Sequence, residues 1–186
     1  ADTYWYKNNF CGAHFSYCKS LKKISLNKMP YLQKDMFYSC TNLEEVYIPS
    51  CKEFKTDSKK DLKLLYIKKV TLGFQSIQFG YISSGSLTHI SFPHVTSIPA
   101  KTFLNFKNLV SCKFPMATTI GASAFQGCLK LSELEIPNVV ELQGDYNFYN
   151  CENLQSLSLR SLVTVNSSSL NIFQGCRGLQ YIAFPD

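Results

Sequence analysis

The sequence predicts an α/β repeat solenoid of about eight stacked coils rather than a globule built around one central site. A leucine followed by apolar residues three and five positions later recurs along the chain, 19 to 25 residues apart. An aromatic residue six positions before that leucine and a cysteine three positions before it recur with it. The segment 119–137, TIGASAFQGCLKLSELEIP, is the clearest copy, with Phe125 and Cys128 ahead of Leu131. Self-similarity at such a period is the signature of repeat architectures.

The recurring positions form columns that extend over nearly the whole chain. The anchor leucines are Leu21, Leu43, Leu62, Leu87, Leu109, Leu131, Leu154 and Leu179. The aromatic column holds Phe15, Phe37, Tyr81, Phe103, Phe125, Phe148 and Phe173, and the cysteine column holds Cys18, Cys40, Cys128, Cys151 and Cys176. Proline follows the apolar trio at Pro49, Pro93, Pro115, Pro137 and Pro185.

Each column predicts one part of a coil. After the anchor, the pattern changes to a period of two, which is typical of a short strand with Leu134 and Ile136 inward and Glu133 and Glu135 outward. Proline cannot donate to a ladder and therefore closes the strand. The i, i+3, i+6 spacing of aromatic, cysteine and leucine favours a short helical turn. Apolar residues eleven positions after the anchors supply a return wall: Leu32, Phe54, Ile98, Ile120, Leu142 and Val165.

These residues resemble the leucine-rich repeats of the BspA type, whose core reads A-F-x-x-C-x-x-L. The match is clearest at Ala124, Phe125, Cys128 and Leu131. The resemblance implies a right-handed superhelix with short parallel strands on a concave face and short helical turns and loops on the convex face. It also implies cell-surface display and adhesion, because the family is mostly linked with these roles.

The chain divides into a flank and a solenoid. Residues 1–14 do not fit the frame and are expected to cap the first coil, or to end a preceding repeat in a longer parent. Residues 15–186 form the solenoid, with an irregular third repeat at about 52–82. The last strand is followed by no polar closing segment, so we expect a longer parent protein or end-to-end self-association. The start at Ala1 indicates that a leader was removed or that a piece was cut from a longer protein.

Composition limits the classes of partner. The chain has 186 residues, 45% of them hydrophobic, and a net charge of +6. This mild basic excess favours acidic partners but is weaker than a dedicated nucleic-acid binder requires, so no nucleic acid is expected. A membrane span is not expected either, since no run of 18 apolar residues occurs. The basic patch of Lys59, Lys60, Lys63, Lys68 and Lys69 is read either as a solvated loop or as a site that attracts sulfated or sialylated glycans.

Seven of the eight cysteines have a packing position in the frame, and Cys11 has none. The cysteines of the column are expected to be buried thiols rather than disulfides, although neighbours in the column would lie within disulfide reach. There is no C-x-x-C pair, and the three histidines are scattered. The sequence therefore predicts no metal site, no catalytic residue, no cofactor and no enzymatic activity.

The strand face is the remaining candidate for function. Solenoids commonly bind partners on such sheets. Tyr47, Leu64, Tyr66 and His89 form the best predicted patch, although exposed tyrosines are also explained by strand preference alone. Charged residues accompany them on the same face: Glu45, Lys113, Glu133 and Glu135.

Two function classes stay open. The first is a non-enzymatic adhesion or recognition module, extracellular or at the cell surface, that binds a host or matrix protein or a glycan. The alternative is an intracellular scaffold or regulatory interaction domain in the cytoplasm.

Overall fold

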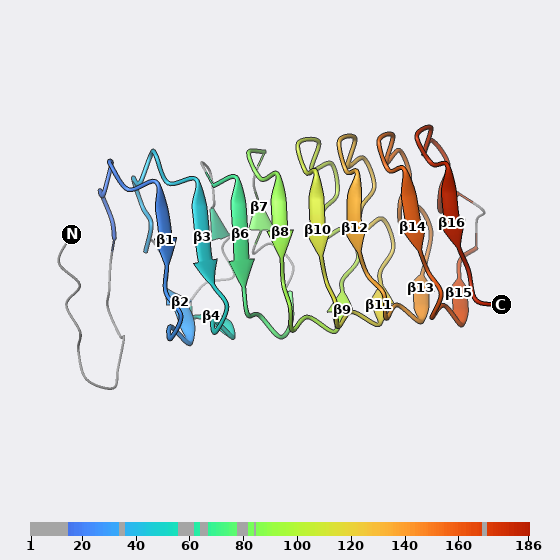
Figure 1. Ribbon diagram of the computed structural model, residues 1–186, viewed down its shortest axis with the longest axis horizontal. Coiled ribbons are helices and arrows are strands. Elements are labelled where there is room, and N and C mark those ends of the chain that lie inside the picture. The colour runs from blue at the N-terminus through green and yellow to red at the C-terminus, as the bar shows by residue number, and fades with distance from the viewer. Residues whose placement is uncertain are drawn as a thin grey trace.

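The computed structural model describes residues 15–33, 36–55, 62–63, 67–77, 82–83, 85–168 and 171–186. Within these ranges the chain winds as a parallel-strand solenoid, and Figure 1 shows its strands side by side in one row from the N-terminal to the C-terminal end. The predicted cap at residues 1–14 lies outside the described residues.

The main sheet carries one strand from each successive coil. Its six parallel strands, in spatial order, are β1 (Lys23–Ser25), β3 (Glu45–Ile48), β6 (Lys69–Leu72), β8 (His89–Ser91), β10 (Ser111–Lys113) and β12 (Glu133–Glu135). A parallel pair, β14 (Ser156–Ser158) and β16 (Tyr181–Ala183), continues the row, with β14 in contact with β12. All neighbours are one coil apart in the chain, as stacking of repeats requires.

The predicted return wall is a second set of parallel strands. Four of them form one sheet, β9 (Ser97–Ile98), β11 (Thr119–Ile120), β13 (Glu141–Gln143) and β15 (Thr164–Asn166). One wall pair stands apart, β2 (Tyr31–Gln33) with β4 (Glu53–Lys55). A further pair, β5 (Leu62–Lys63) with β7 (Ile82–Ser83), is not part of the wall, because its strands come shortly before Ile67 and Leu87, where other coils have their turns. The wall position is fully buried at Ile98, Ile120 and Leu142, whereas Val165 is 48% exposed.

Proline marks the corner between the two sheets. In the segment 114–117, the Ala117 amide donates to the Phe114 carbonyl across Pro115, and the segment 136–139 repeats this bond across Pro137. Proline presets the φ angle that the second residue of such a β-turn needs. Where proline is present, it therefore ends the main-sheet strand and directs the chain into the next wall.

The aromatic–cysteine segment is a stack of turns, and the helical turns predicted there are wrong. No helix occurs among the residues that the structure describes. The cysteine amide donates to the aromatic carbonyl three residues earlier, as from Cys128 to Phe125 (3.2 Å). The residue before the cysteine has a positive φ, which a type II turn requires and which interrupts a right-handed helix. These residues are Tyr17, Ser39, Gly127, Asn150 and Gly175; Asn105 has the same φ sign before Phe106, which takes the place of the cysteine in its turn.

The turns also bond from coil to coil. The Phe103, Phe125 and Phe148 amides donate to carbonyls of the following coil at 2.8–3.0 Å. Their rings stack in the same direction, with centroids 5.3 Å apart between Phe103 and Phe125 and 5.7 Å apart between Phe125 and Phe148. The turn side is therefore a third hydrogen-bonded ladder lined by a column of aromatic rings.

The cysteine column completes this ladder. The Cys128 thiol donates to the Phe103 carbonyl (3.1 Å), and the Cys151 thiol donates to the Phe125 carbonyl (3.1 Å), in each case one coil back. The aromatic carbonyl thus accepts two hydrogen bonds, one from its own turn and one from the neighbouring coil. Burial alone explains a small apolar residue here, but the bond explains why that residue carries S–H.

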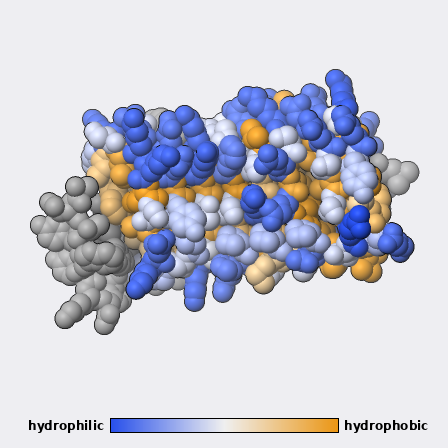
Figure 2. Space-filling model, viewed as in Figure 1, coloured by the Kyte–Doolittle hydropathy of each residue, from blue (hydrophilic) through white to orange (hydrophobic). Residues whose placement is uncertain are grey.

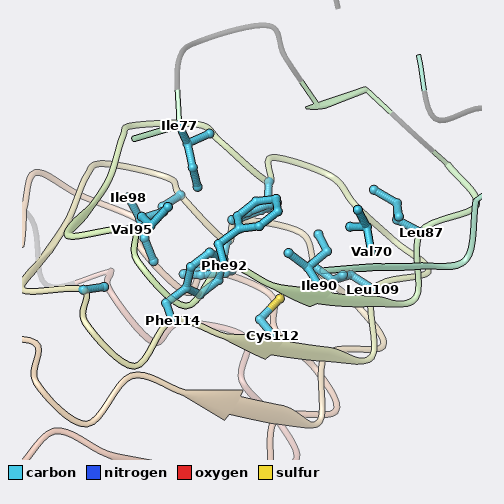
Figure 3. Packing of buried hydrophobic residues seen from close by; sticks show 14 of the residues in the cluster. Val70, Ile77, Leu87, Ile90, Phe92, Val95, Ile98, Leu109, Cys112 and Phe114 are labelled. Atoms are coloured by element: carbon cyan, nitrogen blue, oxygen red, sulfur yellow. The ribbon is translucent and has the colours of Figure 1, made fainter. Parts of the chain in front are cut away.

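The buried core lies between the two sheets and the turns. Figure 3 shows Phe92 and Phe114 packed beside Ile90 and Cys112, all from neighbouring coils. The Phe92 and Phe114 centroids are 5.8 Å apart. Because each ring contacts the coil before and the coil after, no coil completes its core alone.

The third repeat has a different register from the predicted one. The sequence pattern placed its apolar trio at Leu62, Leu65 and Ile67, but β6 pairs Val70 with Val46 and Leu72 with Ile48. The trio is therefore Ile67, Val70 and Leu72, all of which are buried. A leucine-centred search missed it because isoleucine occupies the anchor position and a leucine-rich run precedes it.

A matched pair of substitutions tests the thiol bond. Cys128 and Cys112 are both fully buried, but within the described residues only Cys128 of the two donates its S–H to a carbonyl. We expect Cys128→Ala to lower the free energy of unfolding by about 1 kcal/mol more than Cys112→Ala, because it also removes a hydrogen bond. Urea denaturation measures both, and equal losses would show that the column is held by packing alone.

Candidate functional site

The outward face of the main sheet presents two rows of side chains. The strand register aligns the first row as Lys23, Glu45, Lys69, His89, Ser111 and Glu133, and the second as Ser25, Tyr47, Thr71, Ser91, Lys113 and Glu135. The central strand residues between the rows are apolar and point into the core, where Val46, Val70 and Ile90 are buried. Figure 2 shows a hydrophobic stripe along this face, with hydrophilic residues on both sides of it.

The structure brings together some predicted site residues but not all of them. Glu45 and Tyr47 lie on β3, and His89 lies two strands away on β8. The strand between them is β6, whose outward residues are Lys69 and Thr71. Lys69 and Thr71 therefore hold the sheet positions that the sequence pattern gave to Leu64 and Tyr66. Leu64 and Tyr66 themselves lie outside the described ranges.

The predicted basic patch is divided in the same way. Lys68 and Lys69 lie beside and on β6 of the main sheet, and both are exposed. Lys63 belongs to β5, which pairs with β7 in a separate sheet. Lys59 and Lys60 lie outside the described residues. The three described lysines thus belong to two different segments of the third repeat.

Charged side chains in the first row pair from coil to coil. The Glu45 carboxylate lies 3.0 Å from the Lys23 ammonium and 3.8 Å from the Lys69 ammonium. One position earlier in each coil, Lys68 donates to Glu44 at 2.8 Å. This bond and the charges of Lys68, Lys22 and Lys23 lower the pKa of Glu44. The sequence did not predict these pairs, although a search for opposite charges one repeat apart finds them.

A second ion pair lies farther along the sheet. The Lys113 ammonium is 3.1 Å from the Glu135 carboxylate on the neighbouring strand. Glu133, in the first row of β12, is exposed and makes no ion pair within the described residues. Three of the predicted charged residues, Glu45, Lys113 and Glu135, therefore contact charges of this chain.

Between the two groups of ion pairs lies an uncharged strip, which we define as Tyr47, Thr71, His89 and Ser91. The Tyr47 side chain is 48% exposed. His89 is half-buried, with its Nδ1 atom 2.8 Å from the Thr88 hydroxyl. None of the four forms an ion pair with another residue that the structure describes. A ligand at this strip would meet an aromatic ring and polar groups without displacing a charge pair.

The cysteines do not form a reactive centre among the described residues. Cys18, Cys40, Cys51, Cys112, Cys128, Cys151 and Cys176 are free thiols, and only Cys18 of these is exposed. Burial raises the pKa of Cys128 to about 12 and raises that of Cys112 well above its ordinary value. Such thiols are protonated at neutral pH and are poor nucleophiles and poor metal ligands.

The described ranges do not bring three or more His, Cys, Asp or Glu side chains into a group that could hold a metal ion. In the same ranges, no helix has the length and apolar character needed to cross a bilayer.

Comparison with known proteins identifies the family. The model of the BspA type leucine-rich repeat region matches residues 8–68 and 75–186, in six copies. The chain belongs to the BspA-type leucine-rich repeat proteins. The family model matches six copies of the repeat, so the eight repeats expected from the anchor pattern stay a prediction.

One solved structure supports the fold. A leucine-rich repeat protein from Bacteroides ovatus has a TM-score of 0.56 and 22% sequence identity, over 90% of this chain and 50% of that one. The BspA-type chain thus spans about half the length of that protein. A leucine-rich cell surface protein from Faecalibacterium prausnitzii has a TM-score of 0.32 and 14% identity, over 91% of this chain and 74% of that one. A comparison with curated proteins found no match.

The buried thiols give the stability a defined pH dependence. A thiol with a raised pKa favours the folded state below its ordinary pKa of 9.0, and this contribution is lost as pH rises toward the folded value of about 12. We expect the urea midpoint to fall from pH 9 to 11, and to fall less steeply in Cys128→Ala, which lacks this group. Tyrosine ionisation affects both proteins alike, so parallel midpoint curves would contradict the assignment.

Proposed function

We propose that this domain is a non-enzymatic recognition module, displayed at a cell surface, that binds a host or matrix protein or a glycan on the outward face of its main sheet. Membership of the BspA-type family supports protein interaction as the general role. Surface display follows from the usual association of the family with adhesion. The ligand-binding role is assigned to Glu45, Tyr47, His89, Lys113, Glu133 and Glu135 on the described face.

The observation that carries the proposal is the uncharged strip at the centre of the sheet. Strand spacing places its side chains about 4.8 Å apart from coil to coil, so four residues on three strands form a flat surface about 10 Å wide. Tyr47 offers a rigid aromatic ring with a hydroxyl, the kind of side chain that dominates interface energies. The ion pairs on both sides of the strip hold the charged side chains at its borders. They thereby limit which charged groups a bound ligand can contact.

The turn side supports the proposal by contrast. Its recurring geometry uses the aromatic rings, the amides and the thiols in contacts between coils, as at Phe125 and Cys151. The outward side chains of the main sheet are not required for stacking the coils. Only the central residue of each strand points into the core. Variation there leaves the solenoid intact, which is the condition for a binding surface on a repeat scaffold.

A binding screen with a matched pair of tyrosine variants tests this proposal. The domain is screened on extracellular-matrix proteins and glycans, and each ligand found is titrated with Tyr47→Ala and with Tyr38→Ala. Both tyrosines are about half-exposed, at 48% and 56%, but Tyr38 lies on the turn side. We expect Tyr47→Ala to weaken binding by about tenfold or more and Tyr38→Ala to change it little. Equal effects, or no effect of Tyr47→Ala, would exclude the strip.

The alternative of an intracellular scaffold predicts a different result from the same screen. The seven described thiols are free, which is compatible with a reducing compartment as well as with burial at a cell surface. If no matrix protein or glycan binds while the thiols are readily maintained in the reduced state in cells, the scaffold becomes the preferred function.

A further inference from the structure

The net charge of the chain is confined to its N-terminal half. Residues 1–93 contain thirteen lysines against seven carboxylates, whereas residues 94–186 contain six basic side chains against six carboxylates. The whole excess of +6 therefore belongs to the first half. The first half contains no arginine, so its positive charges are all ammonium groups.

On the described surface, part of this charge is organised as a block on three consecutive coils. We define the lysine block as Lys22, Lys23, Glu44, Glu45, Lys68 and Lys69. The Glu44 and Glu45 amides both bond to the Lys22 carbonyl, and the Lys68 and Lys69 amides both bond to the Glu44 carbonyl. Backbone pairing thus places two glutamates between two pairs of lysines, with a net charge of +2.

The ion pairs inside the block leave its lysines available. The side chains of Lys23, Lys68 and Lys69 are 70%, 53% and 56% exposed although each contacts a glutamate. An ammonium group has three donors, and one carboxylate contact uses only part of that capacity. Exposed pairs of this kind contribute about 0–1 kcal/mol, so a polyanion can compete for the lysines at low cost.

We propose that the lysine block binds a sulfated polysaccharide chain laid across the coils, along the solenoid axis. This inference rests on the proposed recognition function and specifies its ligand class. The two lysine pairs are two coils apart, roughly 10 Å at strand spacing, so a linear chain with repeated anionic groups meets both pairs at once. Ammonium groups without guanidinium forks suit sulfates at variable positions rather than one bidentate geometry.

The surroundings favour a polysaccharide over an acidic peptide. The three strands that carry the block are hydrogen-bonded within the main sheet, and β3 and β6 have neighbours on both sides. A peptide therefore cannot add to these two strands by main-chain pairing, which is a usual source of affinity for extended peptides. Beside the block lies Tyr47, whose ring gives a flat surface for a sugar ring to cover.

Titration of the domain with heparin as the sulfated probe, and with its desulfated form, tests the inference. Replacing Lys22, Lys23, Lys68 and Lys69 by Gln is expected to weaken heparin binding at least about tenfold. The matched control, a second lysine variant, replaces Lys101, Lys107 and Lys130 together with Arg160 by Gln and removes the same charge from the second half, with little expected effect. Affinity is also expected to fall steeply with added salt.

The glutamates of the block provide a variant that gains function. Glu44→Gln/Glu45→Gln removes the competing carboxylates and is expected to tighten heparin binding several-fold, a gain that misfolding cannot produce. Three results would each overturn the inference: equal weakening by the two lysine variants, no tightening by the glutamate variant, or equal binding of polyglutamate and heparin. If the block fails while another ligand still depends on Tyr47, the recognition function stands without it.

Discussion

The hydrogen-bonded stack of aromatic–cysteine turns fixes the register on which the rest of this structure depends. At Phe103, Phe125 and Phe148, the aromatic amide donates to the following coil, and the aromatic carbonyl accepts from its own turn and from the thiol of the following coil. With both backbone groups satisfied, the turn can be buried against its neighbours without leaving polar atoms unpaired. The residue with positive φ takes part in the same ladder, since the Gly127 amide donates to the Tyr149 carbonyl of the following coil (2.8 Å).

Register on the turn side determines what the opposite side presents. When coils stack without slipping, residues at the same place in the frame line up as rows on the main sheet. Lys23, Glu45 and Lys69 are brought into contact in this way although more than twenty residues separate each from the next. A shift of one residue would reverse the faces of every strand and remove both the ion pairs and the strip around Tyr47.

Much of this arrangement could be predicted from the sequence. The anchor pattern predicted the main strands wherever leucine holds the anchor, and the eleven-residue offset predicted the wall at Ile98, Ile120 and Leu142. The anchor pattern failed in the third repeat, because Ile67 stands there in place of leucine. The pattern therefore assigned the outward positions of that strand to Leu64 and Tyr66, whereas the structure has Lys69 and Thr71 there. The helical turns were wrong because i, i+3 spacing fits a chain of type II turns equally well, and only the φ of the residue before the cysteine separates the two. The sequence predicted which face of the sheet is the candidate surface. It did not predict the ion pairs on that face, because they depend on contacts between coils that residue spacing alone does not show.

We propose that the turn side holds the solenoid together and that the main sheet binds the ligand around Tyr47 and the lysine block. Hydroxyl-radical footprinting of the domain with and without bound heparin, or with a ligand from the binding screen, measures this at individual tyrosines. Tyr17 and Tyr38 report on the turn side, and Tyr47 reports on the sheet; all three are exposed in the free protein. We expect Tyr47 to be strongly protected from oxidation in the complex, while the oxidation of Tyr17 and Tyr38 is unchanged. Protection of the turn tyrosines with Tyr47 unchanged would contradict it.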